Sequence, residues 1–263
     1  MRTTLRVATG TGFAVDDLRV VARTPVWWPP EAVSEHRVVF VRRGLFRVRL
    51  PGWTGLVDPL VAYVRPAGAE HAIAHRPGVA DACTVISLDG ALADQALPDG
   101  PAARPLTTSA AVDLAHRTLL ARARQGADEF ELTERVLTLA DRLFGLPRPP
   151  GGGSPSHRRL TDAARARLVA DPAGPTFGAL AAELGVSRPH LSRVFRAVTG
   201  ATLTTFRTGV RVRAALDAID AGRTNLADLA ADLGFADHAH LTRTLRAELG
   251  SPPGRVRAVL RGW

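Results

Sequence analysis

The sequence predicts an α+β protein in which a β-rich first half, followed by two helices, precedes an all-α second half. Short apolar runs with the period of strands fill residues 13–88, helical periodicity begins near Ser109, and a Pro- and Gly-rich segment then leads into a helical sequence that repeats itself. We therefore expect a small barrel or sandwich with two helices at residues 1–145, a linker at 146–157 and a helical domain at 158–263.

The strands are expected where β-branched and aromatic residues gather between turn-forming residues. Gly and Pro punctuate these stretches, as at Pro51-Gly52 and Pro77-Gly78, and mark the turns. Strands of this length and spacing indicate a sandwich or a barrel. The clearest runs cover residues 37–43, 45–50, 60–64 and 82–88.

Two amphipathic helices are expected between Ser109 and Phe144. The second opens with Asp128 and Glu129, whose charges suit the positive end of a helix dipole. Both apolar stripes fit two roles, a cover for the barrel or a dimer contact, and a stripe alone does not separate them. The stripe residues are Val112, His116, Leu119, Leu120 and Ala123, then Leu132, Val136, Leu139 and Leu143.

The segment from Leu146 to Ser156 is predicted to be neither helix nor strand. It reads LPRPPGGGSPS. Proline removes backbone donors, and a run of glycines favours the unfolded ensemble. We take this segment as the boundary between the two halves.

The second half contains an internal repeat of one unit. Residues 180–196 (LAAELGVSRPHLSRVFR) return as residues 229–246 (LAADLGFADHAHLTRTLR). The offset is 49 residues at Gly185 and Gly234 and 50 at His190 and His240, so the second copy has one extra residue in its turn. A short helix, a Gly-led turn and an Arg-rich second helix are the pattern of a helix-turn-helix DNA reader.

Capping residues and breakers set the expected helix limits. The expected N-caps are Thr176, Ser187, Asn225 and Asp237. The expected helices cover residues 158–170, 177–184, 188–198, 203–221, 226–233 and 238–249. The long helix that joins the two units is expected to carry an apolar stripe of Phe206, Val210, Ala214 and Ala218 on one face. It would span roughly 28 Å, close to the roughly 34 Å between successive major-groove faces on one side of B-DNA.

The second helix of each unit is expected to bury an apolar side and to leave a polar side open. Leu191 and Phe195 point inward in the first copy, and Leu241 and Leu245 in the second. The open faces would enter the major groove. They carry Arg188, Pro189, Ser192, Arg193 and Arg196 in the first copy, and His238, Ala239, Thr242, Arg243 and Arg246 in the second.

Positive charge gathers in this second half. The chain has a formal net charge of +9, and all its basic residues are Arg. Residues 1–150 hold 18 basic and 16 acidic side chains, whereas residues 151–263 hold 16 and 9. A polyanion is therefore the first partner to consider, although net charge alone does not separate DNA from RNA or an anionic membrane.

Residues 158–261 resemble the DNA-binding domain of the AraC/XylS (arabinose-regulator) family of transcription factors. The matching motif runs from Gly234-Phe235-Ala236-Asp237 through Leu241-Thr242-Arg243 to Gly250-Ser251-Pro252-Pro253, with Arg257. The resemblance implies a sequence-specific regulator that binds double-stranded DNA, with activation as the expected mode. It also implies guanine contacts by Arg193 and Arg243 and phosphate contacts by Arg196 and Arg246.

Three residues depart from the family pattern. Leu245 stands where Phe is usual and Val256 where Tyr is usual, and both are apolar replacements that should leave the core intact. Leu203 stands where Pro is frequent, and we expect it to loosen the start of the connecting helix.

The first half is similar to the cupin-like regulatory domains that precede this DNA-binding unit in many family members. The similarity lies in the stretch from Val57 to Cys83. It implies a small-molecule effector or pairing of two copies at the barrel, and RNA polymerase and a homodimer as protein partners. Candidate ligand contacts are Trp27, His36, His71 and His75.

Three other classes of protein are alternatives to this interpretation. A metal-dependent cupin enzyme fused to a DNA-binding domain would use His71 and His75 with Glu70 and His36, but the usual pair of His separated by one residue with a Glu shortly after is missing. We therefore expect no metal, no cofactor and no catalytic residue, and hydrogen-bonded structural roles for these histidines.

A DNA-repair alkyl transferase needs a Cys cluster, and Cys83 is the single cysteine. An architectural DNA-binding protein is disfavoured because the open faces of the two repeats differ in sequence. The lone cysteine fits a reducing compartment, and no apolar run approaches the roughly 18 residues of a membrane span. We expect a cytoplasmic protein without a membrane partner.

Overall fold

The computed structural model describes residues 1–97, 102–146 and 153–261. Its first half forms two antiparallel sheets, with strand orders β1-β2-β8-β3-β6-β9 and β5-β4-β7. The strands are β1 (Arg2–Gly10), β2 (Phe13–Val21), β3 (His36–Arg43), β4 (Phe46–Leu50), β5 (Trp53–Val57), β6 (Val61–Arg65), β7 (Ala72–Ala74), β8 (Ala80–Leu88) and β9 (Arg104–Thr107).

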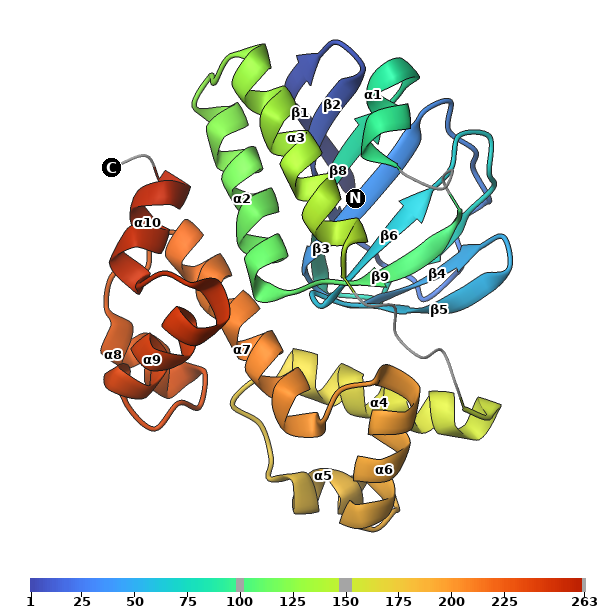
Figure 1. The fold of residues 1–263 in the computed structure, drawn as a ribbon. Coiled ribbons are helices and arrows are strands. Elements are labelled where there is room, and N and C mark those ends of the chain that lie inside the picture. Colours follow the sequence, from blue (N-terminus) through green and yellow to red (C-terminus); the bar gives the residue numbers. More distant parts are fainter. Residues whose placement is uncertain (98–101, 147–152, 262–263) are drawn as a thin grey trace.

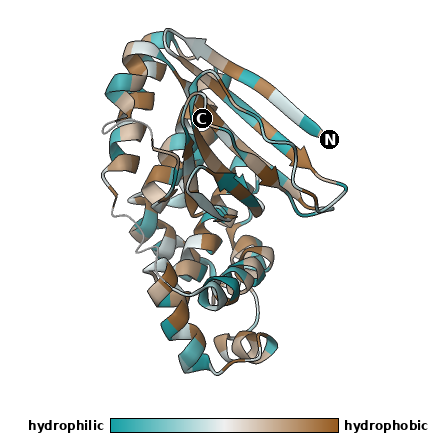
Figure 2. Ribbon diagram, turned by 90° about the vertical axis from the view of Figure 1, so that its right-hand side faces the viewer, coloured by the Kyte–Doolittle hydropathy of each residue, from teal (hydrophilic) through white to brown (hydrophobic). Residues whose placement is uncertain are grey.

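The larger sheet is buried on both faces, which explains its continuous apolar runs. In β3, Val38 and Phe40 pack toward the helices, whereas Val39 and Val41 pack toward the smaller sheet. Strand β1 lies at the edge, alternates hydrophilic and hydrophobic residues and is largely exposed (Figure 2). The interior between the two sheets is therefore one core, and the space under the helices is another.

Helices α1 (Gly90–Ala96), α2 (Ala110–Arg124) and α3 (Glu129–Phe144) cover the larger sheet (Figure 1). The predicted stripes of α2 and α3 are buried in the core that they share with β2, β3, β6 and β8. The stripes therefore act as a cover for the sheet. Helix α2 also contacts α7, α9 and α10 of the second half, so it lies between the two halves of the chain.

The described residues of the second half are helical, which confirms the predicted α+β class with a β-rich first half, two helices and an all-α second half. Its helices are α4 (Pro155–Ala170), α5 (Phe177–Glu183), α6 (Arg188–Thr199), α7 (Leu203–Asp220), α8 (Leu226–Asp232), α9 (His238–Leu249) and α10 (Pro253–Arg261).

Some predicted limits were wrong. Residues Pro155, Ser156 and His157 were expected in the linker, but α4 begins at Pro155 because Ser154 caps it and proline suits the first turn of a helix. Residues 147–152 of the predicted linker lie outside the described part of the chain. Strands β1 and β9 and helices α1 and α10 were not predicted.

Helix α7 is the shared element of the two repeated units. Phe206 and Val210 belong to the core of the first unit, and Val212, Leu216 and Ile219 belong to that of the second. The predicted stripe also contained Ala214 and Ala218, which are only half-buried. The stripe was partly wrong because α7 is covered from several directions, so no single face describes its burial.

The family departures fit these cores. Leu245 and Val256 are buried in the second unit, and Leu203 is the first residue of α7 and is buried in the first unit. Thr202 caps α7 by accepting a hydrogen bond from the Thr205 N–H at 3.0 Å. A capped start and a buried side chain stabilise this end of the helix, and the expected loosening relative to proline at Leu203 stays a prediction.

Buried ion pairs join the two halves. The Arg117 side chain of α2 is 2% exposed and contacts Asp113 at 2.9 Å and Asp217 of α7 at 2.5 Å. Asp58, after β5, contacts Arg165 of α4 at 2.7 Å and is 0% exposed. These pairs hold α4 and α7 against the β-domain.

Two glycines at the same place in the repeat predict different costs of substitution. Gly185 and Gly234 have φ of 69° and 71°, so an alanine would be strained at both by roughly 1–2 kcal/mol. A Cβ at Gly185 meets nothing within 4 Å, whereas one at Gly234 would lie 2.8 Å from the Ala173 Cα. We expect Gly234→Ala to lower the free energy of unfolding more than Gly185→Ala in denaturant titrations. Equal losses would contradict the predicted contact.

The Arg117 contacts predict a large effect of a single truncation. Arg117→Met would leave Asp113 buried and unpaired, at a cost of about 3–5 kcal/mol in the free energy of unfolding. Arg43→Met is the matched control, because Arg43 is 62% exposed and pairs with the same Asp217 at 3.1 Å, and exposed pairs contribute about 1 kcal/mol or less. If both variants lose the same free energy of unfolding, the buried ion pairs of Arg117 do not stabilise the fold more than the exposed pair of Arg43 does.

Candidate nucleic-acid interface

The start and the end of helix α6 are determined by the turn before it and by its capping residues. Gly185 has positive φ and turns the chain after α5. The Ser187 side chain accepts a hydrogen bond from the His190 N–H at 3.4 Å, and Pro189 lies in the first turn, where it displaces no helical hydrogen bond. Gly200 ends the helix in the left-handed conformation.

Helix α9 repeats this construction with different residues. Asp237 accepts a hydrogen bond from the His240 N–H at 2.6 Å, and Gly250 ends the helix with φ of 68°. His240 also accepts a hydrogen bond from the Ala236 N–H at 3.3 Å and packs edge-on against Phe235. His240 therefore has a structural role, and His238 is left on the open face.

The ten residues predicted for the open faces lie where the spacing placed them. Nine are exposed, and Thr242 is half-buried with its hydroxyl 3.4 Å from the His238 Nε2. The apolar sides of α6 and α9 are buried through Leu191, Phe195, Leu241 and Leu245. Each helix therefore presents one open polar face, as an element that enters a groove must.

The guanidinium groups on these faces are free of acidic partners. Among the described residues, no ion pair involves Arg193, Arg196, Arg243 or Arg246, although many arginines elsewhere are paired. The nearby acids are occupied instead. Glu183 and Asp232, at equivalent places in the two units, pair with Arg167 and Arg223, each at 2.6 Å.

The two units are fixed relative to each other. They lie at the two ends of α7, with α4, α5 and α6 at one end and α8, α9 and α10 at the other (Figure 1). Arg211 of α7 donates to the carbonyl oxygens of Pro172 at 2.9 Å and Ala173 at 3.3 Å, in the loop before α5. Gly234, in the turn of the second unit, lies against this loop. Because the 18 residues of α7 span about 27 Å, the open faces are held apart by a structured spacer.

The candidate ligand contacts of the barrel have separate partners. Trp27 lies under the Arg49 guanidinium, 4.5 Å from the ring centroid. The His36 Nδ1 accepts a hydrogen bond from the Ala67 N–H at 3.0 Å. His75 is buried, and its Nδ1 lies 2.6 Å from an Asp81 carboxylate oxygen.

His71 differs from the other three because part of it is unpartnered. Its Nδ1 donates to the Glu31 carbonyl oxygen at 2.7 Å, whereas its buried Nε2 has no hydrogen-bond partner among the described residues. Burial, together with the nearby Arg65 charge, lowers the pKa of His71 to about 4. The ring is therefore neutral at pH 7.

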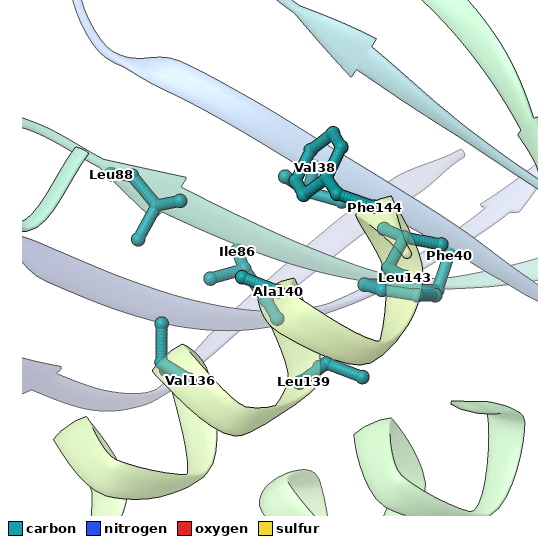
Figure 3. A pocket seen from close by; sticks show the side chains of 9 residues that line it. All are labelled: Val38, Phe40, Ile86, Leu88, Val136, Leu139, Ala140, Leu143 and Phe144. Carbon is teal, nitrogen blue, oxygen red and sulfur yellow. The ribbon is translucent and has the colours of Figure 1, made fainter. Parts of the chain in front are cut away.

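Three further features bear on ligands. In the described part of the chain, no three His, Cys, Asp or Glu side chains are grouped so that they could hold a metal ion. A pocket between the larger sheet and α3 is lined by apolar side chains (Figure 3), and its volume of about 10 Å³ is at the lower limit for holding one water molecule. Cys83 is buried in β8, and burial raises the pKa of its thiol to about 12.

The contacts between the halves were not predicted from the sequence. Arg117 and Asp217 are at least 100 residues apart in the sequence, and so are Asp58 and Arg165, so no local spacing relates either pair.

The described helices include none with the length and apolar character needed to cross a bilayer.

Comparisons with known proteins found one family model and several solved structures. Residues 180–258 match the family model described as a helix-turn-helix domain. Solved structures with a similar fold include fatty-acid-bound ToxT from Vibrio cholerae, with 8% identity over 97% of this chain and 98% of that chain and a TM-score of 0.39.

A second similar structure is a cupin superfamily protein from Desulfitobacterium hafniense, with 13% identity over 34% of this chain and 79% of that chain and a TM-score of 0.30. At these scores the likenesses assign neither a ligand nor a function. No curated protein matches the sequence.

The buried neutral histidines predict acid sensitivity. Burial also lowers the pKa of His116, so His71 and His116 take up protons more readily in the unfolded chain than in the folded one. Stability from these groups is complete above their unfolded pKa of about 6.5 and is lost as pH falls, by roughly 3 kcal/mol for His71 at pH 4. Denaturant titrations from pH 7 to pH 4 should show this loss.

A matched pair of variants assigns the loss to the buried rings. His116→Leu removes one such ring and should flatten the profile below pH 6.5, whereas His238→Leu, on an exposed face, should leave the profile as it is. A profile that is unchanged in His116→Leu would be against this explanation.

Proposed function

We propose that this chain, whose residues 180–258 form an AraC-type helix-turn-helix domain, is a sequence-specific transcription regulator that acts in the cytoplasm rather than an enzyme. The β-rich control domain would be residues 1–145, and the DNA-reading domain would follow the linker. Helices α6 and α9 would each enter the major groove, on successive turns of one duplex.

One observation carries this proposal: the equivalent open faces of α6 and α9 carry arginines without acidic partners. An exposed guanidinium with no intramolecular partner is free to fork onto a guanine edge or to neutralise a phosphate. Arg193 and Arg243 lie at equivalent positions, offset by 50 residues, and their matched presentation supports two readers that act together. Ser192 and Thr242 would add hydrogen bonds to bases, whereas Pro189 and Ala239 offer apolar contact.

The buried ion pairs suggest how the first half could control the second. Arg117 and Asp58 contact α7 and α4, the helices that position both readers. A small effector in the β-domain, a second copy of the chain or RNA polymerase would act on DNA binding by changing these contacts.

The two arginine roles predict different responses to truncation. Operators would first be selected from random DNA with the full chain. Arg243→Ala should then cost about 1–3 kcal/mol of binding free energy at one base position and relax the choice of base there, because a bidentate base contact is lost. Binding to operators mutated at each position measures this.

Arg246→Ala is the matched control on the same helix. It should weaken operator and random DNA alike and reduce the slope of log affinity against log salt by about 1, because a phosphate contact is lost. Equal losses on operator and random DNA for Arg243→Ala would contradict base reading by α9. Unchanged binding in both variants would contradict DNA contact by this face.

A further inference from the structure

A buried arginine in the β-domain has no partner for one edge of its guanidinium. Arg65, at the end of β6, is 4% exposed. Its Nε and Nη2 atoms are buried and have no hydrogen-bond partner among the described residues. Burial lowers its pKa to about 10, so it is still charged at neutral pH. A buried, unpaired charge is costly, and proteins rarely hold one without a use for it.

The strand register places other unpartnered polar groups beside it. Arg37 pairs with Arg65 across β3 and β6, and Ser87 pairs with Arg37 across β8 and β3. Cross-strand partners point to the same face of a sheet. These three side chains therefore form a row on the face that meets the smaller sheet, since Val39, Tyr63 and Val85, two positions along each strand, belong to the core between the sheets.

The other two side chains of the row also have buried polar atoms without hydrogen-bond partners. The Arg37 Nε and the Ser87 Oγ are buried and have no partner among the described residues. Two guanidinium groups directly opposite each other repel, unless an anion lies between or beside them. His71 adds its own unpartnered Nε2 near Arg65, whose charge acts on the ring. We call Arg37, Arg65, His71 and Ser87 the inner polar row.

The unpartnered atoms of Arg65 and His71 indicate which chemical groups a ligand would need. In an arginine, Nε–H and one Nη2–H form a single edge that donates two parallel hydrogen bonds, and the two oxygens of a carboxylate match it. His71 has the opposite character. Because its Nδ1–H is donated to the Glu31 carbonyl oxygen, the neutral ring leaves Nε2 as an acceptor.

Glu31 is the obvious internal candidate for this edge, and its carboxylate is used elsewhere. Its Oε1 lies 3.3 Å from the Arg2 Nη1 and 4.0 Å from the His71 Nε2, and its side chain is 45% exposed. Glu35, the other nearby acid, accepts a hydrogen bond from the Arg37 Nη2 at 3.2 Å. Neither acid occupies the free edge of Arg65.

We propose that the inner polar row is a binding site for a small carboxylic acid that also carries a hydroxyl or amino group. The carboxylate sits on the Nε/Nη2 edge of Arg65, with Arg37 and Ser87 beside it, and the hydroxyl or amino group donates to the His71 Nε2. This identifies the chemical class of the effector and so rests on the proposed function for its regulatory meaning, but the binding itself does not depend on DNA.

The test uses the full chain without DNA, in isothermal titration calorimetry at constant ionic strength. The probes are lactate and 3-hydroxybutyrate, their matched acids without a hydroxyl, propionate and butyrate, and inorganic phosphate. At least one hydroxy acid should bind, and its parent acid should bind about fivefold more weakly through the loss of one neutral hydrogen bond. Tighter binding of phosphate would overturn the carboxylate assignment.

Two variants separate a binding role from a structural one. Arg65→Met should weaken binding at least tenfold and should not lower the melting temperature of the unliganded protein, because it removes an unpaired buried charge. His71→Asn keeps a donor for the Glu31 carbonyl but has no acceptor at the position of the His71 Nε2, so it should bring the affinities for the hydroxy acid and its parent acid together. Arg19→Met is the control, because Arg19 is 71% exposed, and it should bind as the wild type does.

Three results would overturn the proposal: no binding of any carboxylate at tens of millimolar, a marked fall in melting temperature in Arg65→Met, or an unchanged preference for the hydroxy acid in His71→Asn. Operator affinity is measured separately. Loss of DNA binding by the wild type with carboxylate binding intact would refute the regulator assignment alone, and the reverse would refute the site alone.

Discussion

The guanidinium of Arg117 is the contact on which the arrangement of this molecule most depends. It is buried between α2, which covers the sheet, and α7, which carries both helix-turn-helix units, and it contacts carboxylates on each helix. A charge in that position is tolerated only while both partners stay in place. Separation of the halves would expose or strand at least one of these charges, so the halves are coupled through a contact that favours one geometry.

That coupling has a direct consequence for DNA reading. Helix α7 supplies part of the core of each unit, and Arg211 and Gly234 hold the turn of the second unit against the loop of the first. The two open faces are therefore positioned as one rigid pair, which suits a site with fixed half-site spacing. A shift of α2 would act on the spacer α7 and on α9, both of which α2 contacts, and a shift of the loop at Asp58 would act on α4 of the first unit.

The two halves of the chain differ in where their unpartnered arginine atoms lie. On α6 and α9, unpaired arginines are exposed, where water makes them inexpensive until a phosphate or a base replaces it. In the inner polar row, Arg65 is buried, its Nε and Nη2 have no partner among the described residues, and a buried polar edge without partners costs free energy. Exposure suits a large polyanion that arrives from outside, and burial suits a small ligand that is enclosed.

Local patterns specified most of the second half, because helix caps, turn glycines and apolar spacing act over a few residues. Ser187, Asn225 and Asp237 capped the helices that they were expected to cap, and the open faces of α6 and α9 followed from the same spacing. The edge strand β1 escaped prediction because its exposed, mixed sequence has no apolar run. The buried pairs Arg117–Asp217 and Asp58–Arg165, and the row that joins Arg37, Arg65 and Ser87, belong to the tertiary structure alone. They arise when distant segments meet, and only then does burial decide which charges are paired and which are left free.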